Sequence, residues 1–293
     1  MTLPVSVIVV TRNEAPRLRA CLAALSAFDD IWVVDSSSAD GTVALAQTLG
    51  AKTSDFIWNG TYPKKRQWCL DHLPLAYDWV FFVDADEIVP AALIGEIEAL
   101  FLSGPPACNG YFVTGLYQVG TQVLRYGMAN RKLVLFDRRQ FAFPVVDDLT
   151  ITGMGEIEGH YQPVGRAGCR ARIGRLREPL FHVALEDEFL WQERHLGYAQ
   201  WEAGMTLRGA WPVDPIWWRQ WMKTLWRGRR FRAELYFLVA YILLSGWRDG
   251  ALGRKLAVLK YKYYKSIYII IKNQKQQGHT HDIITRADPS DRH

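Results

Sequence analysis

The chain has 293 residues, 49% of them hydrophobic and 22% charged, which excludes a low-complexity or disordered protein and suits one large α/β domain with an appendage or two small domains. Its four cysteines lie far apart without a C-x-x-C pair, which argues against a zinc site or a disulfide framework and fits a reducing compartment. The net charge of +5 is uneven: Trp217 to Gln277 carries fourteen Lys/Arg and two acids, and the remainder carries 21 basic and 28 acidic residues. A basic C-terminal quarter on an acidic body predicts an anionic surface as its partner.

Strand and helix patterns alternate over the first fifty residues. Val5–Val10 is an apolar run typical of a buried strand, and the helix predicted after it places apolar residues at helical spacing from Leu18 to Leu25. Ile31–Val34 predicts a second strand. A second helix is expected after the loop Ser36–Thr42, with its end at Gly50. This βαβ order predicts a parallel, doubly wound sheet.

The segment Trp79–Glu87 is an apolar and aromatic run that ends in three carboxylates. The run predicts a strand buried on both faces. Asp84 and Asp86 then fall at its carboxyl end, where open α/β sheets bind ligands. Two aspartates one residue apart suit a hard divalent cation that keeps positions open for phosphate oxygens. The alternative is a strand that ends in a solvated acidic turn.

The rest of the first two hundred residues continues the mixed pattern. Pro90 begins a predicted helix that runs to about Leu102. Further strands are expected at Tyr111–Tyr117 and Lys132–Phe136, and a further helix at Glu186–Glu202. Lys132 is expected on the surface, with contact to a phosphate as the alternative.

From Trp211 onward the chain becomes rich in tryptophan and basic residues. Six of the twelve tryptophans lie between Trp211 and Trp247. The longest apolar run, Leu235–Leu244, has ten residues, about half of the ~20 that a bilayer-spanning helix needs. Short apolar faces with tryptophan, lysine and arginine favour helices that lie in the membrane interface. The alternative is a helical subdomain that packs on the body, which would leave the scarcity of acids unexplained.

Asp35 ends the second predicted strand, where a dinucleotide enzyme places an acid on the ribose. The first βα turn, Thr11–Glu14, nevertheless contains no glycine, so it lacks the close approach to a pyrophosphate that nicotinamide and flavin enzymes need. A nucleotide site remains in which a metal at Asp84 and Asp86 neutralises a diphosphate. Glycosyl transfer from a nucleotide-sugar has this requirement.

Several segments, in consistent order and spacing over about ninety residues, resemble family 2 of the glycosyltransferases: Ser6–Glu14, Val34–Thr42, Lys65–Gln67 and Asp84–Glu87. The C-terminal part looks like one branch, the bacterial enzymes that extend lipopolysaccharide core or exopolysaccharide on lipid carriers, through Glu193–Ala203 and Phe231–Gly253. The resemblance implies the GT-A fold, a Rossmann-like α/β fold with a mostly parallel, doubly wound sheet. It also implies an inverting hexosyl transfer from a nucleotide-sugar donor.

The resemblance assigns roles residue by residue. The donor nucleotide pocket would be formed by Thr11, Glu14, Asp35, Arg66 and Asp84. Within it, Asp35 would contact the base or ribose, Arg66 the nucleotide or its phosphates, and Asp84 the ribose or the metal. Arg194 and His195 could contact the donor phosphate or the acceptor, or lie in solvent.

The metal would be Mg²⁺ or Mn²⁺, ligated by Asp86 and Asp84, and it would stabilise the departing diphosphate as a Lewis acid. Some GT-A enzymes use a late histidine as a further ligand. His182 is the candidate here, although a histidine after an apolar run is more often structural.

Inversion in one displacement also requires a general base on the acceptor hydroxyl. The related branch often carries Val-His-Glu after its last core strand, and the matching segment here is Val146-Asp147-Asp148. Asp148 is the first candidate for the base, with Asp147 and Glu158 behind it. The two adjacent acids would raise each other's pKa, which suits a base. The alternative is a solvated acidic loop.

Together these observations predict a GT-A catalytic domain over 1–205, a basic, tryptophan-rich membrane-interface region over 206–278 and a flexible tail over 279–293. The predicted function is metal-dependent transfer of a sugar to a lipid-linked glycan, lipopolysaccharide or exopolysaccharide at the cytoplasmic face of the plasma membrane, by a peripheral protein. The anionic membrane surface is the expected partner, and nucleic acid is not. The alternatives are a polyprenyl-phosphate sugar synthase and a non-catalytic membrane scaffold of a polysaccharide assembly complex.

Overall fold

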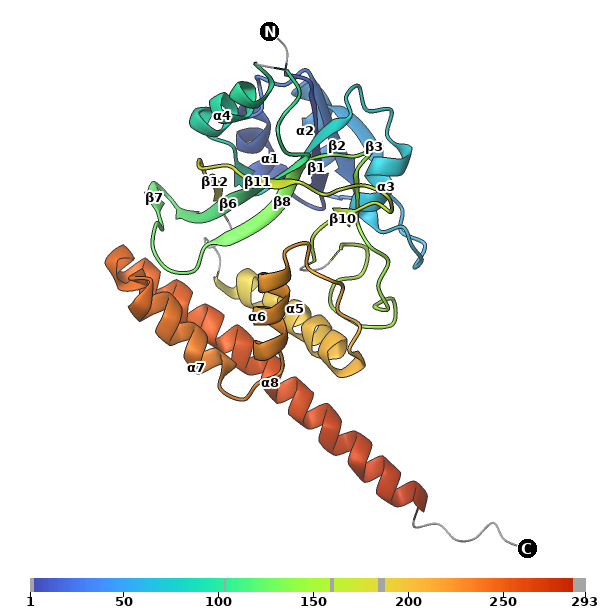
Figure 1. Cartoon of the computed structure of the whole chain (residues 1–293), viewed down its shortest axis with the longest axis vertical. Helices are drawn as coiled ribbons and strands as arrows, with labels where there is room; N and C mark the ends of the chain where they lie inside the picture. The colour runs from blue at the N-terminus through green and yellow to red at the C-terminus, as the bar shows by residue number, and fades with distance from the viewer. Residues whose placement is uncertain (1–2, 103, 159–160, 184–187, 287–293) are drawn as a thin grey trace, which may run out of the picture.

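The computed structural model describes residues 3–102, 104–158, 161–183 and 188–286, with backbone alone from 278 onward. A large mixed sheet forms the upper part of the molecule in Figure 1, and a group of C-terminal helices lies beneath it. The sheet has the strand order β3-β2-β1-β4-β8-β6-β12-β5, with β7 and β11 also paired to β6.

The N-terminal half of the sheet is parallel, as the sequence predicts. Its strands are β1 (Val5–Thr11), β2 (Asp30–Asp35), β3 (Lys52–Asp55) and β4 (Trp79–Asp84). The helices between them are α1 (Ala15–Ala23), α2 (Thr42–Thr48) and α3 (Lys65–His72). Because β1 pairs in parallel with both β2 and β4, the carboxyl ends of these three strands meet at one edge.

The second half of the sheet is mixed: β11 and β12 pair in parallel with β6, while its other pairings are antiparallel. Beside β4 lies β8 (Asn130–Asp137), antiparallel to it and to β6 (Gly110–Val119). The remaining strands of this sheet are β5 (Glu87–Ile88), β7 (Gln122–Val123), β11 (Ile173–Arg175) and β12 (Leu180–His182). A separate two-stranded sheet pairs β9 (Phe141–Ala142) with β10 (Val164–Gly165). The helix predicted from Pro90 is α4 (Ala91–Phe101).

The core is centred on β4. The four residues from Val80 to Val83 are buried, which confirms that this strand is covered on both faces. They pack with β1, with the inner faces of α1 and α4 and with the aromatic residues of β8 and β9. The strand is therefore held rigidly up to the point where its acids begin.

The C-terminal helices are packed on one another. They are α5 (Glu188–Arg208), α6 (Trp217–Trp226), α7 (Arg232–Phe237), a π-helical segment η1 (Leu238–Leu243), a 3₁₀ segment η2 (Gly246–Asp249) and the long α8 (Gly250–Arg286). A second hydrophobic cluster joins Trp191, Ala199 and Ala203 of α5 to Leu259, Tyr263, Ile267 and Ile271 of α8.

This packing bears on the domain boundaries predicted from the sequence. The boundary between residues 205 and 206 falls inside α5, whose buried Trp201 and Met205 belong to the main core. The predicted tail, 279–293, begins inside α8, and its last seven residues lie outside the described part. In the described residues, no helix combines the length and the hydropathy that a bilayer crossing requires.

Candidate active site

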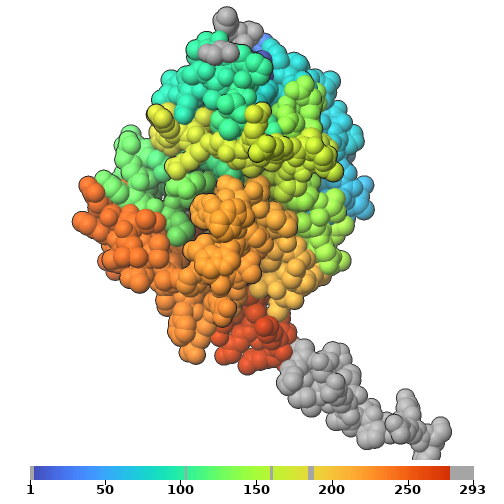
Figure 2. Space-filling view, in the orientation of Figure 1, coloured from blue at the N-terminus to red at the C-terminus, as the bar shows by residue number. Residues whose placement is uncertain are grey.

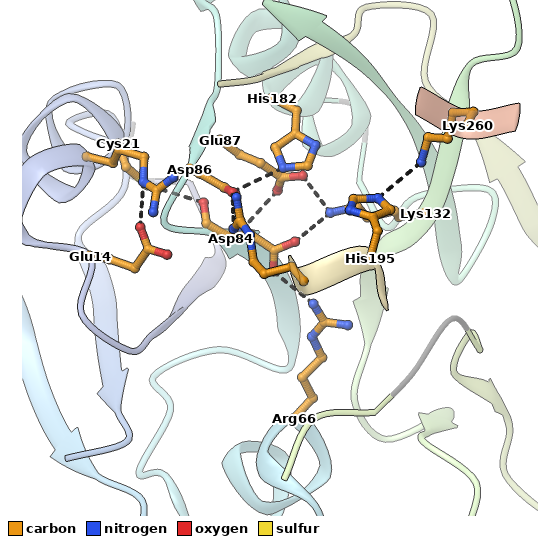
Figure 3. A network of polar contacts seen from close by, with 12 residues as sticks. Glu14, Cys21, Arg66, Asp84, Asp86, Glu87, Lys132, His182, His195 and Lys260 are labelled. Carbon is orange, nitrogen blue, oxygen red and sulfur yellow. Dashed lines mark hydrogen bonds and ion pairs between the residues drawn. The ribbon is translucent and has the colours of Figure 1, made fainter. Parts of the chain in front are cut away.

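The acids that follow β4 lie among cations that come from four different elements (Figure 3). Arg66 of α3 donates from Nη2 to Oδ1 of Asp84 at 2.8 Å, and Lys132 of β8 donates from Nζ to its Oδ2 at 2.6 Å. Burial alone would raise the pKa of Asp84, but Lys132 and Arg66 outweigh it and hold the pKa well below the usual range. Asp84 is therefore an anion with both oxygens in use.

Glu87 of β5 is a fully buried partner of this pair. Its Oε1 accepts a hydrogen bond from Lys132 Nζ at 2.6 Å, and its Oε2 accepts the backbone N–H of Asp84 at 3.0 Å. Burial raises the pKa of Glu87, and Lys132 acts against that rise. Glu87 thus fixes the turn after β4 and places Lys132 beside the site, so the expectation that Lys132 lies on the surface is wrong.

Asp86 is nearly buried and faces His182 of β12, whose Nε2 lies 3.2 Å from Asp86 Oδ2. Arg194 of α5 is 3.7 Å from the same oxygen. Burial alone would lower the pKa of His182, but Asp86 outweighs it and raises the pKa to about 9. Two of the predicted metal ligands are thus brought together, from the turn after β4 and from β12, which are almost a hundred residues apart.

A further cation reaches this side of the site from the last helix. Tyr117 of β6 stacks on His182 with 5.2 Å between ring centroids. Lys260 of α8 lies 5.7 Å from the Tyr117 ring and 5.4 Å from the Trp191 ring, and its Nζ is 3.5 Å from Nε2 of His195. Burial alone would lower the pKa of Lys260, but Tyr117 outweighs it and raises the pKa. The last helix, α8, therefore helps to form the site, and no sequence pattern indicates this role for Lys260.

The donor set limits what metal this site could hold. Within the described residues, no group of three or more His, Cys, Asp or Glu side chains is placed to bind a metal ion. Asp86 and His182 offer one carboxylate and one imidazole, while the oxygens of Asp84 are engaged by cations. Two protein donors fit a Mg²⁺ or Mn²⁺ ion that takes its other ligands from substrate phosphate and water.

Arg66 is held in place through its own backbone. The buried carboxylate of Glu158 accepts the N–H groups of Arg66 at 2.9 Å and of Gln67 at 2.8 Å, at the first turn of α3. Glu158, a candidate base in the sequence, therefore serves here as a capping residue of that helix. The Nε of Arg66 is buried and has no hydrogen-bond partner among the described residues, which leaves a donor for a phosphate oxygen.

The predicted nucleotide pocket lies at the ends of β1 and β2. Asp35 is buried, and its Oδ1 accepts hydrogen bonds from Thr11 Oγ1 at 2.9 Å and Ser38 Oγ at 2.6 Å. Its Oδ2 accepts the Ser38 N–H at 2.7 Å. Glu14 forms an ion pair with Arg17 at 2.7 Å, and burial raises the pKa of Glu14. Thr11 and Asp35 are thus in contact, whereas the Glu14 carboxylate is near Arg17, Asp86 and Arg194. Contact of all three residues with a nucleotide stays a prediction.

The two candidate bases on one loop have different surroundings. Asp148 is buried, and its carboxylate accepts hydrogen bonds from Tyr62 at 2.8 Å, Lys64 at 2.7 Å and Trp201 at 2.9 Å. Asp147 is largely exposed and pairs with Arg208 at 3.2 Å. The carboxylate of Asp148 thus joins the segment before α3 to α5. Its role as the base stays a prediction and requires these hydrogen bonds to open.

Comparison with known proteins identifies the part of the chain that carries the acids of the site, while His182, Arg194 and Lys260 lie beyond it. Residues 6–148 match the family model described as glycosyl transferase family 2. This part of the chain is a family 2 glycosyltransferase domain. The family 2 domain contains the parallel strands β1 to β4, the acids after β4 and Arg66 and Lys132, and its mixed sheet with flanking helices is a GT-A fold.

Individual relatives match only part of this chain. A Rickettsia felis protein named as an uncharacterised glycosyltransferase is 38% identical over 103 residues, 34% of each chain. The lipopolysaccharide core biosynthesis glycosyltransferase LpsC of Rhizobium meliloti is 34% identical over 96 residues, 31% of this chain and 34% of LpsC. These matches span about a third of each relative. The crystal structure of S. aureus TarS 1-349 is 14% identical with a TM-score of 0.42, over 94% of this chain and 91% of that one.

Proposed function

We propose that this chain is an inverting, divalent-cation-dependent glycosyltransferase. It moves a sugar from a nucleoside-diphosphate donor to a lipid-linked glycan, lipopolysaccharide or exopolysaccharide acceptor at the cytoplasmic face of the plasma membrane. The observation that carries this proposal is the pairing of Asp86 with His182 at the end of β4, next to Arg66, Lys132 and Arg194. A carboxylate and an imidazole suit a cation, and the three basic side chains suit a diphosphate.

In this transfer the acceptor hydroxyl oxygen forms a bond to the anomeric carbon, the bond from that carbon to the diphosphate breaks, and the diphosphate leaves with the electron pair. A cation held by Asp86 and His182 would act as a Lewis acid on that leaving group. Arg66 and Lys132 are preorganised by Asp84 and Glu87, so their charge does not have to be assembled during the reaction. A loop carboxylate, Asp148 or Asp147, accepts the hydroxyl proton.

The proposal of a lipid-linked or lipopolysaccharide acceptor is supported by observations outside the active site. LpsC, which matches a third of this chain, is named for lipopolysaccharide core biosynthesis. The basic, tryptophan-rich segment after Trp211 is what an enzyme needs to act on an acceptor anchored in a bilayer.

The test is turnover with a panel of UDP-, GDP- and dTDP-sugars, measured as release of the nucleoside diphosphate with Mn²⁺ and with EDTA. We expect release from one donor class with Mn²⁺ and its loss in EDTA. Arg66→Gln should lower turnover about a hundredfold because it removes a preorganised cation, whereas the exposed Arg19→Gln should leave it unchanged. Neither binding nor release with any donor would refute the proposal and favour the scaffold alternative.

A further inference from the structure

The helix α6 exposes its apolar face to solvent. Trp217 is 82% exposed, Trp221 is 59% exposed and Leu225 is 38% exposed, and these three residues follow one another at four-residue spacing along the same face. Trp218 and Met222 extend the face and are also exposed. None of the ten residues of α6 is buried. A helix of a globular protein usually turns such a face toward the core, so this face lacks its partner.

The basic face of α6 is turned the other way, toward the protein. Asp214, which is nearly buried, lies 2.6 Å from Lys223 Nζ and 3.6 Å from Arg219 Nε. The Arg219 guanidinium also lies 4.7 Å from the ring centroid of Phe112 in β6. These contacts fix the rotation of the helix about its axis. The exposure of the tryptophans is therefore a property of the fold.

A cluster of arginines lies where α6 meets the sheet. Arg131 of β8 pairs in register with Thr114, and Arg175 of β11 donates to the Thr114 hydroxyl at 3.5 Å. Burial, Arg175 and Arg219 all lower the pKa of Arg131, so the three guanidiniums lie close enough to repel one another. Neither Arg131 nor Arg175 forms a salt bridge within the described part of the chain. Such a cluster offers several guanidinium donors to an anion.

The arginine cluster is separate from the sugar-nucleotide site. Lys132, the next residue along β8, points to Asp84 and Glu87. Because successive strand residues point to opposite faces of a sheet, Arg131 lies on the other face of β8 from Lys132. The donor diphosphate, bound beside Lys132, is thus not the anion that this cluster would take.

The charge around α6 indicates which partner covers its apolar face. From Trp217 to Arg232 the chain has six basic residues and no acid. Figure 2 shows the orange surface of α6 on the front of the molecule, with the darker orange α7–η1 segment beside it. Leu243 of η1 and Trp247 of η2 are exposed apolar residues as well. Tryptophan and leucine surrounded by arginine and lysine match a bilayer interface that carries negative headgroups.

We propose that α6 inserts its tryptophan face into an anionic membrane and that Arg131, Arg175 and Arg219 receive a headgroup phosphate there. The inference rests on the proposed function and deepens it by naming the surface that holds the enzyme against its acceptor. The membrane then lies against α6 and the β11 side of the sheet.

Sedimentation with phosphatidylcholine vesicles, prepared with and without phosphatidylglycerol, tests the inference on the full chain. Wild-type protein should bind the anionic vesicles. Trp217→Ser/Trp221→Ser should lower the partition coefficient at least about tenfold. Leu102→Ser, an equally exposed apolar position at the end of α4, should leave it unchanged. Because all three positions are exposed, the thermal unfolding midpoint should not move in any variant.

A second pair of variants tests whether the arginine cluster binds a headgroup phosphate. Arg131→Gln/Arg175→Gln should lower the preference for phosphatidylglycerol, while Arg19→Gln should leave it unchanged. Inorganic phosphate at constant ionic strength should compete with the anionic vesicles for wild-type protein but not for the double arginine variant. Binding of free phosphate without binding of anionic vesicles would overturn the lipid assignment.

Donor hydrolysis without vesicles is measured in parallel, so that failure of the membrane proposal can be distinguished from failure of the proposed glycosyltransferase activity. Hydrolysis by a protein that does not bind anionic vesicles would refute the membrane surface alone. A wild-type dimer in sedimentation velocity that the tryptophan variant no longer forms would show that a second copy covers α6, and would likewise overturn the inference.

Discussion

Asp148 connects three parts of the molecule through one buried carboxylate. Its hydrogen bonds to Lys64 and Trp201 join the segment before α3 to α5. A buried ion pair contributes little by itself, but removal of one partner leaves an unpaired charge in a dry environment. The residue has a structural role whether or not it also serves as the base.

Asp148→Asn is therefore expected to destabilise the protein by about 3–5 kcal/mol, because Lys64 loses its anionic partner. Asp147→Asn, at the exposed neighbouring position, should change stability by less than about 0.5 kcal/mol. Chemical denaturation of both variants measures this difference. Equal stabilities would show that the buried pair is not formed.

The same two variants also decide which carboxylate is the base. If Asp147→Asn retains its stability and loses turnover of a sugar donor and acceptor, Asp147 is the base. If it turns over normally while folded Asp148→Asn does not, the base is Asp148 and its hydrogen bonds open in the complex.

At the scale of elements, the site is formed where β4, β8, β12, α3, α5 and α8 meet. Lys260 shows how far this assembly extends, because α8 brings its ammonium next to Tyr117 and His195. A stripe of apolar contacts between α5 and α8 fixes that position.

Lys260→Met is expected to keep the packing of α8 and to lower donor turnover about ten- to a hundredfold, because the side chain retains its length and loses its charge. Lys262→Met, at an exposed position of the same helix, is the matched control and should have no effect. Turnover of a nucleotide-sugar at saturating and limiting donor measures both variants. An active Lys260→Met enzyme would confine the site to the family 2 domain, β12 and α5.

Strands β1, β2 and β4 and the position of Asp84 and Asp86 could be predicted because apolar runs and strand ends are local signals, whereas β3, with the polar sequence KTSD, gives no such signal. The residues that surround these acids in space could not be predicted. Lys132 looks like a surface residue in sequence, since nothing local shows that β8 pairs antiparallel with β4 some fifty residues away. Asp148 likewise lies in an acidic segment that looks solvent-exposed in sequence. Its burial depends on Lys64 and Trp201, which are distant in sequence.

At the scale of the whole molecule, the catalytic half and the C-terminal helices are interdependent. The second hydrophobic cluster lies between α5 and α8, and Arg232 pairs with the buried Glu202 of α5. In Figure 1, α8 runs beneath the sheet domain and then away from it. The near part of α8 therefore belongs to the folded body.

A chain truncated to residues 1–249 should lose stability because it exposes Trp191, Ala199 and Ala203. A chain of residues 1–277 removes only residues beyond the last one of this cluster, Ile271, and should unfold at the wild-type temperature. Differential scanning calorimetry compares the two. Wild-type stability in the shorter chain would show that α8 is not part of the folded body.

The central claim is that Asp86 and His182 hold a cation that binds the diphosphate of a sugar donor. Calorimetric titration of the nucleotide-sugar panel, with and without Mn²⁺, tests it most directly when wild-type protein is compared with Asp86→Ala. The account predicts Mn²⁺-dependent binding of one donor class by the wild type and its loss in Asp86→Ala. Binding heat unchanged in Asp86→Ala, with the same Mn²⁺ dependence, would contradict it.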